Sequence, residues 1–150
     1  MPKPTYDYSL RARALGLLAR REHSVKELQR KLAPHVAEGD DLEALLKDLI
    51  KRGWVSDERF AELVVNAKQS RFGSRKLAHE LREKGVDETL AANATAAVDD
   101  LANARTVWQR KYGNLPENRN EWAKQARFLQ SRGFGFDVIK QVLKSNEDEM

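Results

Sequence analysis

Residues 53–86 decide the fold, and they read GWVSDERFAELVVNAKQSRFGSRKLAHELREKGV. Gly53 is expected to end the helix before it, because glycine adopts a positive φ without steric cost. Ser56 is expected to cap the next helix, since its side-chain oxygen can accept from a backbone N–H of the first turn. Two acids follow Ser56, where the helix dipole favours negative charge. This stretch therefore opens with the end of one helix and the start of another.

Two short helices are predicted within this stretch. The apolar residues expected on the inward face of the first have the i, i+3, i+4, i+7 spacing of one helical face: Phe60, Leu63, Val64 and Ala67. Gly73 is predicted to end this helix, and Ser74 is predicted to cap the next one. The second helix should turn Leu77 and Leu81 inward and end at Gly85. Both helices are therefore expected to be short and amphipathic.

The remainder of the chain carries the same helix signals. Ser24 and Glu27 have the spacing of a capping box, in which each side chain accepts a hydrogen bond from the backbone N–H of the other residue. No alternation of apolar and polar residues is long enough to indicate a β-strand. We therefore predict an all-α fold of about nine helices with no β-sheet.

An internal repeat runs through these helices. Three patterns recur at equivalent places: Leu28-x-x-x-Leu32 as Leu77-x-x-x-Leu81, Arg-Phe-Gly at 71–73 as Lys-Tyr-Gly at 111–113, and Leu-x-x-Lys-Gly-Val at 81–86 as Leu-x-x-Arg-Gly-Phe at 129–134. One three-helix repeat buries too little apolar surface to be stable alone, so neighbouring repeats should stack into an elongated array. The predicted parts are a flexible arm at 1–8, repeats at 9–55, 56–98 and 99–145, and a polar tail at 146–150.

Composition narrows the class of protein further. The chain has 150 residues, and its hydrophobic content of 41% is compatible with folding although 33% of the residues are charged. It has no cysteine, which excludes disulfides and cysteine-based zinc or redox chemistry. The N-terminus has no apolar signal-peptide core, and no segment approaches the length needed to span a membrane. We therefore expect a cytoplasmic protein with no membrane partner.

Charge is segregated along the chain. The net charge is +4, but residues 66–84 hold six basic residues against two acids, while residues 86–104 hold four acids and no Lys or Arg. Residues 105–144 are again strongly basic. Solvated helix faces explain any single charge, whereas alternating blocks favour a positive surface that meets a polyanion or an acidic partner.

The sequence contains no signal for catalysis. The three histidines lie on separate elements, without a second ligand at metal-binding spacing: His23, His35 and His79. Neither a P-loop nor a dinucleotide-binding glycine motif is present. No pair of carboxylates is placed by the sequence in an apolar pocket. We predict a protein that is not an enzyme and needs no metal or cofactor.

The central stretch carries a family resemblance. Residues 53–61, 71–77 and 80–86 resemble, in order and spacing, the central motif of the RecX family, whose members regulate the bacterial recombinase RecA. The resemblance implies the same three-repeat fold. It also implies that the partners are RecA protein and the RecA filament on single-stranded DNA. Members of the family limit filament growth or promote disassembly, and so lower strand exchange, ATP hydrolysis and the co-protease activity that triggers the SOS response in DNA repair.

The family has no catalytic residues to carry over, so charge and position are the guides to the contact surface. A monomer that binds through the basic residues of the motif region is expected. The residues predicted to contact the partner or nucleic acid are Arg59, Lys68, Arg71, Arg75, Lys76, Arg82 and Lys84.

Two other classes of function stay open. A direct, sequence-tolerant DNA-binding module would use the basic blocks to contact phosphate. Against it, no helix is singled out as a recognition helix with side chains directed at base edges. Weak DNA binding is also compatible with regulation of a filament. A structural scaffold would explain the helices but not the segregated charge.

Overall fold

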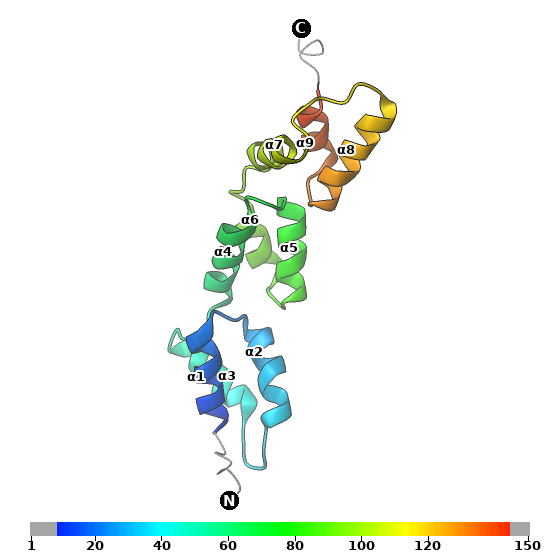
Figure 1. Cartoon of the computed structure of the whole chain (residues 1–150). Helices are drawn as coiled ribbons and strands as arrows, with labels where there is room; N and C mark the ends of the chain where they lie inside the picture. Colours follow the sequence, from blue (N-terminus) through cyan, green and yellow to red (C-terminus); the bar gives the residue numbers. More distant parts are fainter. Residues whose placement is uncertain (1–8, 145–150) are drawn as a thin grey trace, which may run out of the picture. The chain divides into compact units, whose positions relative to one another are not determined.

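The computed structural model describes residues 9–144, and these residues are entirely helical apart from turns and loops (Figure 1). The predicted arm at 1–8 and the predicted tail at 146–150 lie outside the described residues. Within residues 9–144 there is no β-strand, which confirms the all-α prediction. The helices are α1 (Leu10–Arg20), α2 (Val25–Leu32), the 3-10 helix η1 (Ala33–His35), α3 (Leu42–Lys51), α4 (Asp57–Lys68), α5 (Ser74–Glu83), α6 (Glu88–Thr95), α7 (Asp100–Lys111), α8 (Arg119–Ser131) and α9 (Phe136–Val142).

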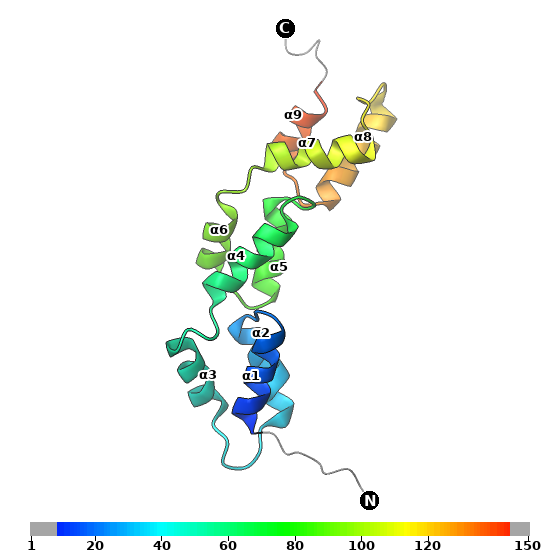
Figure 2. The ribbon, with the colours of Figure 1, turned by 60° about the vertical axis from the view of Figure 1, so that its left-hand side comes forward.

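The described residues form two compact units. The first holds residues 9–60 together with residues 84–86, and the second holds residues 61–83 and 87–144. Helices α1, α2 and α3 of the first unit lie together (Figure 2). The repeat boundaries given above stay a prediction.

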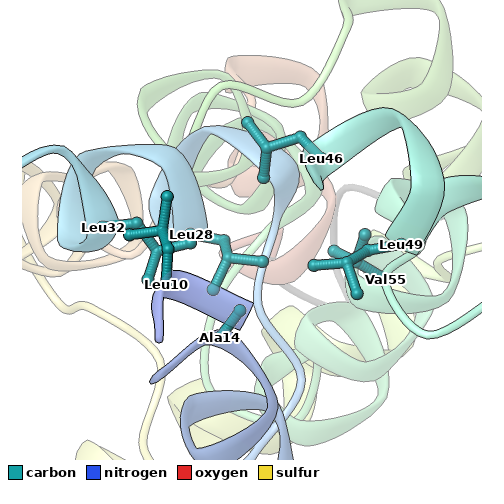
Figure 3. Close-up of a cluster of buried hydrophobic side chains, with 7 residues drawn as sticks. All are labelled: Leu10, Ala14, Leu28, Leu32, Leu46, Leu49 and Val55. Atoms are coloured by element: carbon teal, nitrogen blue, oxygen red, sulfur yellow. The ribbon is translucent and has the colours of Figure 1, made fainter. Parts of the chain in front are cut away.

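Leucines from α1, α2 and α3 build the core of the first unit. Leu28, Leu32 and Leu49 have no exposed surface (Figure 3). Burying a leucine in this way contributes about 1.5–3 kcal/mol relative to leaving it in water. The buried cluster consists of Leu10, Ala14, Leu28, Leu32, Leu46, Leu49 and Val55. A second cluster, in the second unit, joins α7, α8 and α9 through Ala104, Val107, Leu129, Phe134, Ile139, Val142 and Leu143.

Local signals placed several helix ends correctly. The Ser24 hydroxyl oxygen accepts from the N–H of Glu27 at 3.0 Å, and the Glu27 carboxylate accepts from the N–H of Ser24 at 3.2 Å. The predicted capping box is therefore confirmed. Gly53 and Gly85 have φ values of 74° and 86°, the left-handed region expected of a glycine that ends a helix.

The predicted inward face of α4 is wrong by part of a turn. The buried residues of this helix are Phe60, Ala61 and Val65, whereas Leu63 keeps 48% of its surface exposed. Apolar residues surround α4 on most sides, so their spacing does not select one face. Which of these apolar residues become buried is decided by the helices that pack against α4 rather than by its own sequence.

The predicted roles of Gly73 and Ser74 are also wrong. Helix α4 ends at Lys68, and Gly73 instead precedes α5, its carbonyl accepting from the N–H of Leu77 at 3.1 Å. Ser74 is the first residue of α5. Its N–H donates to the Asp100 carboxylate at 2.8 Å, and its hydroxyl donates to the same carboxylate at 2.5 Å. An acid on another helix therefore serves the N-terminus of α5.

A similar set of hydrogen bonds, which we call the junction, occurs once in each unit. It links the start of one helix to the start of a second helix and to the end of a third. In the first unit, the N–H of Val25, the first residue of α2, donates to Asp57 of α4 at 2.8 Å. The Ser24 hydroxyl donates to the carbonyl of Lys84 at 2.6 Å. In the second unit, Ser74 and Asp100 repeat the first contact, and the N–H of Gly73 donates to the carbonyl of Arg132 at 2.7 Å.

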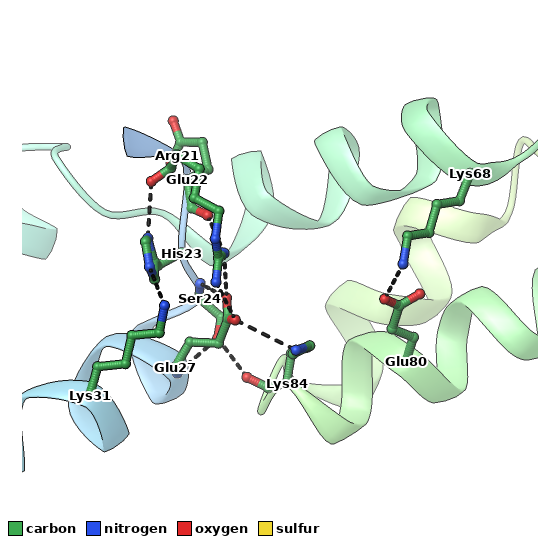
Figure 4. Close-up of polar contacts among 9 residues, drawn as sticks. All are labelled: Arg21, Glu22, His23, Ser24, Glu27, Lys31, Lys68, Glu80 and Lys84. Carbon is green, nitrogen blue, oxygen red and sulfur yellow. Dashed lines mark hydrogen bonds and ion pairs between the residues drawn. The ribbon is translucent and has the colours of Figure 1, made fainter. Parts of the chain in front are cut away.

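A buried histidine lies beside the first of these junctions. His23 is 1% exposed, its Nδ1 lies 2.9 Å from the carbonyl of Arg21, and its Nε2 lies 3.2 Å from the Lys31 ammonium (Figure 4). Since a carbonyl only accepts and an ammonium only donates, the ring is the neutral tautomer with its proton on Nδ1. Burial is the largest effect and lowers the pKa of His23 below 6.5. The hydrogen bond to the Arg21 carbonyl opposes it, the charges of Arg21 and Lys31 lower the pKa further, and Glu27 raises it slightly.

The first prediction concerns how the stability of the protein depends on pH. Below pH 6.5, His23 is protonated in the unfolded chain but stays neutral in the folded chain, where its pKa is lower. The free energy of unfolding therefore falls as the pH falls towards the folded pKa. His23→Asn keeps a donor towards Arg21 and removes the titration. We expect the melting temperature of His23→Asn to fall less than that of the wild type between about pH 7.5 and about pH 5.5. His35→Asn, at an exposed histidine, should behave as wild type. Parallel curves for all three proteins would contradict this account.

Candidate functional site

Three of the seven predicted contact residues form ion pairs within the protein, and Arg59 is the first of them. Its guanidinium binds the Glu22 carboxylate, with Nη2 at 3.2 Å from Oε2, and also donates to the carbonyl of Gly53 at 3.1 Å. Hydrogen bonding to Glu22 raises the pKa of Arg59. Arg59 therefore fixes the turn before α4, and its charge is matched.

Lys84 is held by the capping box of α2. Its ammonium lies 3.6 Å from the Glu27 carboxylate, which also binds Arg21 at 3.0 Å (Figure 4). Burial raises the pKa of Glu27, but hydrogen bonds from Arg21 and from the N–H of Ser24 outweigh it, so the pKa is lowered overall. The buried Glu27 is thus ionised at neutral pH, and Lys84 serves as one of its counter-charges.

Lys68 is the third paired cation, and it lies in the second unit. Its ammonium binds the Glu80 carboxylate at 2.5 Å, which joins α4 to α5 (Figure 4). The other four predicted residues are exposed and have no acid within 4.0 Å among the described residues: Arg71, Arg75, Lys76 and Arg82. Unmatched cations of this kind are available to bind an external anion.

Arg75 and Arg82 line an open groove between α5 and α6. The groove has a volume of about 630 Å³, and its walls also include Glu88 and Asp100. Its floor is formed by small side chains such as Ala78 and Ala92. Because acids share the groove with the arginines, it carries no strong charge of one sign.

Arg71 and Lys76 belong to a cluster around two phenylalanines. The Lys76 ammonium lies 4.7 Å from the centre of the Phe72 ring, and the Arg71 guanidinium lies 5.6 Å from it. Arg132 lies between the rings, 5.6 Å from that of Phe72 and 5.2 Å from that of Phe128. We call this set the basic–aromatic cluster; its members are Arg71, Phe72, Lys76, Lys111, Phe128 and Arg132.

A pocket of about 310 Å³ lies against this cluster. Val107 and Phe128 form its apolar wall, and Arg71, Lys111 and Arg132 stand around it, together with Ser70 and Arg110. None of these four cations has an ion-pair partner within the described part of the chain. Ring faces beside unmatched cations are the combination that binds a nucleic-acid strand, because bases stack on rings while cations bind phosphate.

Sequence reasoning missed Lys111, Phe128 and Arg132. Two of the three nevertheless lay in recurring patterns, since Lys111 matches Arg71 in the Arg-Phe-Gly pattern and Arg132 matches Lys84 in the Leu-x-x-Lys-Gly-Val pattern. Both patterns indicate a repeat, but a repeated basic residue does not by itself indicate a shared contact surface. Phe128 carried no signal of its own, because an aromatic residue in a helix is usually a core residue.

The described residues offer no sign of a metal centre or a membrane segment. No three metal-binding side chains among residues 9–144 come together in a way that could hold an ion. In the same range, no helix combines the length and the apolar character needed to cross a membrane.

The fold and the cationic surface define a helical repeat protein built from three-helix modules. Residues 56–94 match the model of the second three-helix domain of RecX, and residues 98–143 match that of the third. Together the two matches cover more than half of the chain. The chain belongs to the RecX family.

Relatives agree with this assignment along nearly the whole length. The chain is 48% identical over 141 residues to "Regulatory protein RecX" of Chromobacterium violaceum, covering 94% of this chain and 93% of the relative. It is 44% identical over 146 residues to the protein of the same name from Ralstonia nicotianae, covering 96% and 92%. The chain is therefore that of a regulatory protein of the RecX family.

Solved structures agree with the fold. The crystal structure of RecX from Lactobacillus salivarius superposes with a TM-score of 0.78 at 22% identity, covering 89% of this chain and 92% of the other. At this level of identity the likeness concerns the fold alone. It supports the arrangement of helices into an all-α repeat array.

Proposed function

We propose that this protein binds RecA and the RecA filament on single-stranded DNA, and that it limits filament growth. Membership in a family of regulatory RecX proteins supports the partner. Through that contact it would lower the recombinase, ATPase and co-protease activities of RecA. It acts as a monomer in the cytoplasm, by binding and without catalysis of its own.

The observation that carries the contact surface is the basic–aromatic cluster. Arg71, Lys76, Lys111 and Arg132 are unmatched cations, so a polyanion meets no competing internal acid there. Of the residues predicted from sequence, Arg71 and Lys76 are therefore proposed as direct contacts, with Arg75 and Arg82 on the neighbouring groove. Arg59, Lys68 and Lys84 are matched by internal acids and are not proposed as direct contacts.

Capture of purified RecA tests the partner directly. The full chain is immobilised through an N-terminal tag and exposed to RecA alone, or to RecA assembled on oligothymidylate with a non-hydrolysable ATP analogue. We expect retention of RecA, stronger for the filament because several weak contacts act together. Failure to retain RecA in either form would remove the proposal.

Direct binding to DNA is a second candidate, favoured by Phe72 and Phe128 within the cluster. If phosphate contacts dominate, the logarithm of the binding constant for oligothymidylate should fall linearly with the logarithm of salt concentration. Arg132→Ala should weaken binding and reduce the slope by about 0.7, because one phosphate is no longer neutralised. Lys51→Ala, at an exposed lysine of α3, is the control and should change neither. Fluorescence anisotropy over a salt series gives both values, and a salt-independent affinity would exclude this mode.

A further inference from the structure

A groove in the first unit has a different character from the basic–aromatic cluster. It lies between α1 and α2, which pack side by side (Figure 2), and has a volume of about 660 Å³. None of its lining residues belongs to the cluster. They are Ala12, Arg13, Gly16, Leu17, Arg20, Lys31, Leu32 and His35.

The floor of this groove is aliphatic and open. Leu17 and Ala12 supply its accessible apolar surface, while Leu32 lies fully buried in the core beneath. A Cβ atom added to Gly16 would meet nothing within 4 Å. A glycine in the interior of a helix is less favourable than an alanine. Gly16 thus leaves room above α1 where an alanine would fit and favour the helix.

The rim of the groove is cationic and unmatched. Arg13, Arg20 and Lys31 surround it, and no acid lines it. Two acids of this unit are engaged by other cations, since Arg11 binds Asp48 at 2.9 Å and Arg21 binds Glu27 at 3.0 Å. Neither Arg13 nor Arg20 has an ion-pair partner among the described residues. The charge of the rim is therefore left for a ligand.

We propose that this groove binds an acidic peptide segment of a protein partner, with an aliphatic side chain of that segment on Leu17 and Ala12. Charge complementarity selects an acidic ligand, and the floor selects its apolar side chain. A nucleic acid is less suited, because no aromatic ring lines the groove on which a base could stack. The proposal goes beyond the contact of the basic–aromatic cluster and does not rest on it.

A synthetic peptide tests the proposal with the full chain. The probe is a fluorescein-labelled 12-residue peptide of glutamates with two leucines one helical turn apart, measured by anisotropy at low salt. We expect saturable binding, with amide chemical-shift changes in a ¹⁵N-labelled chain concentrated on α1 and α2. Replacing both leucines by serine should weaken binding about tenfold or more, since the apolar side chain on the floor is removed. Equal binding of the serine peptide, or preferred binding of oligothymidylate in this groove, would overturn the proposal.

Charge reversal on the rim tests whether the peptide binds in this groove or is held only by the net positive charge of the protein. Arg13→Glu with Arg20→Glu should weaken peptide binding about tenfold, because two favourable exposed pairs become repulsive. The matched control is Lys51→Glu with Lys124→Glu, which changes the net charge equally at positions outside the groove. If both double variants weaken binding equally, the peptide is held by net charge alone and the groove is not its site.

Substitutions at Gly16 distinguish loss of peptide binding in the groove from loss of folding. Gly16→Leu should raise the melting temperature, since a better helix former replaces glycine, yet abolish peptide binding by filling the groove. Gly16→Ala should also raise the melting temperature but keep binding within about twofold of wild type, because its single methyl fits the space. A Gly16→Leu protein that is stable and still binds the peptide at wild-type affinity would rule out this location.

Discussion

Replacing Arg71, Lys76 and Arg132 together by glutamate is expected to abolish inhibition of RecA ATP hydrolysis on single-stranded DNA. The three cations surround Phe72 and have no internal acid, so their reversal turns the centre of the proposed contact surface repulsive. Weak interactions spread along a polymer multiply through effective concentration, so weakening one of them weakens the whole attachment. The measurement is the DNA-dependent ATPase rate of RecA against the concentration of each variant.

The fold should survive this change, because the three side chains make no ion pair among the described residues and each cation–π contact is worth about 0.5–1 kcal/mol at an exposed site. Far-ultraviolet circular dichroism and the melting curve check this. The matched control reverses three cations outside the cluster, Lys51, Arg105 and Lys124. It should inhibit as wild type does. A folded cluster variant that inhibits at wild-type concentrations would transfer the contact to another surface.

A single methyl group at Gly133 is expected to destabilise the second unit severely. Gly133 ends α8 with φ of 93°, and a Cβ atom there would lie 2.4 Å from Cβ and 2.8 Å from the backbone nitrogen of Lys76. The backbone of α5 cannot move away as a flexible side chain could. We expect Gly133→Ala to cost about 2–5 kcal/mol, from the left-handed conformation and the overlap together.

Gly53→Ala is the matched control for this prediction. Gly53 has a φ of 74°, also in the left-handed region, but a Cβ atom there meets nothing within 4 Å. Its replacement should therefore cost only the conformational part, about 1–2 kcal/mol. Urea unfolding of both variants compares the two costs. Similar losses would mean that Gly133 is required for its φ alone and that the close approach to Lys76 relaxes freely.

The features that sequence predicted are those encoded by neighbouring residues. The capping box of Ser24 and Glu27 spans three residues, so its two hydrogen bonds follow from local spacing. The glycine that ends a helix is equally local. Ser74 shows the limit, because its role depends on Asp100, which is 26 residues away in the chain. Nothing in the residues around Ser74 indicates that an acid from another helix occupies the capping position.

The basic character of the candidate site was predictable from the sequence, but the particular residues that form it were not. The basic character of residues 66–84 and 105–144 is plain in the sequence. Which cations are matched depends on distant partners: Glu22 lies 37 residues from Arg59, and Glu27 lies farther still from Lys84. The convergence of Arg132 on Phe72 likewise depends on how α8 ends against α5. Pairing and convergence of this kind are tertiary properties.

The junction that occurs once in each unit has a consequence for how the number of three-helix modules in such a chain can change during evolution. The hydrogen bonds that recur in both copies have a backbone N–H or carbonyl on at least one side. Its demands on sequence are few: an acid at the start of one helix and a glycine at the end of another. A tandem duplication of one three-helix segment would copy both sides of the junction. The new copy could therefore pack against its neighbour without further substitution. Duplication of a segment can therefore add a module in one step, and deletion of a segment can remove one, without new contacts having to evolve at the junction.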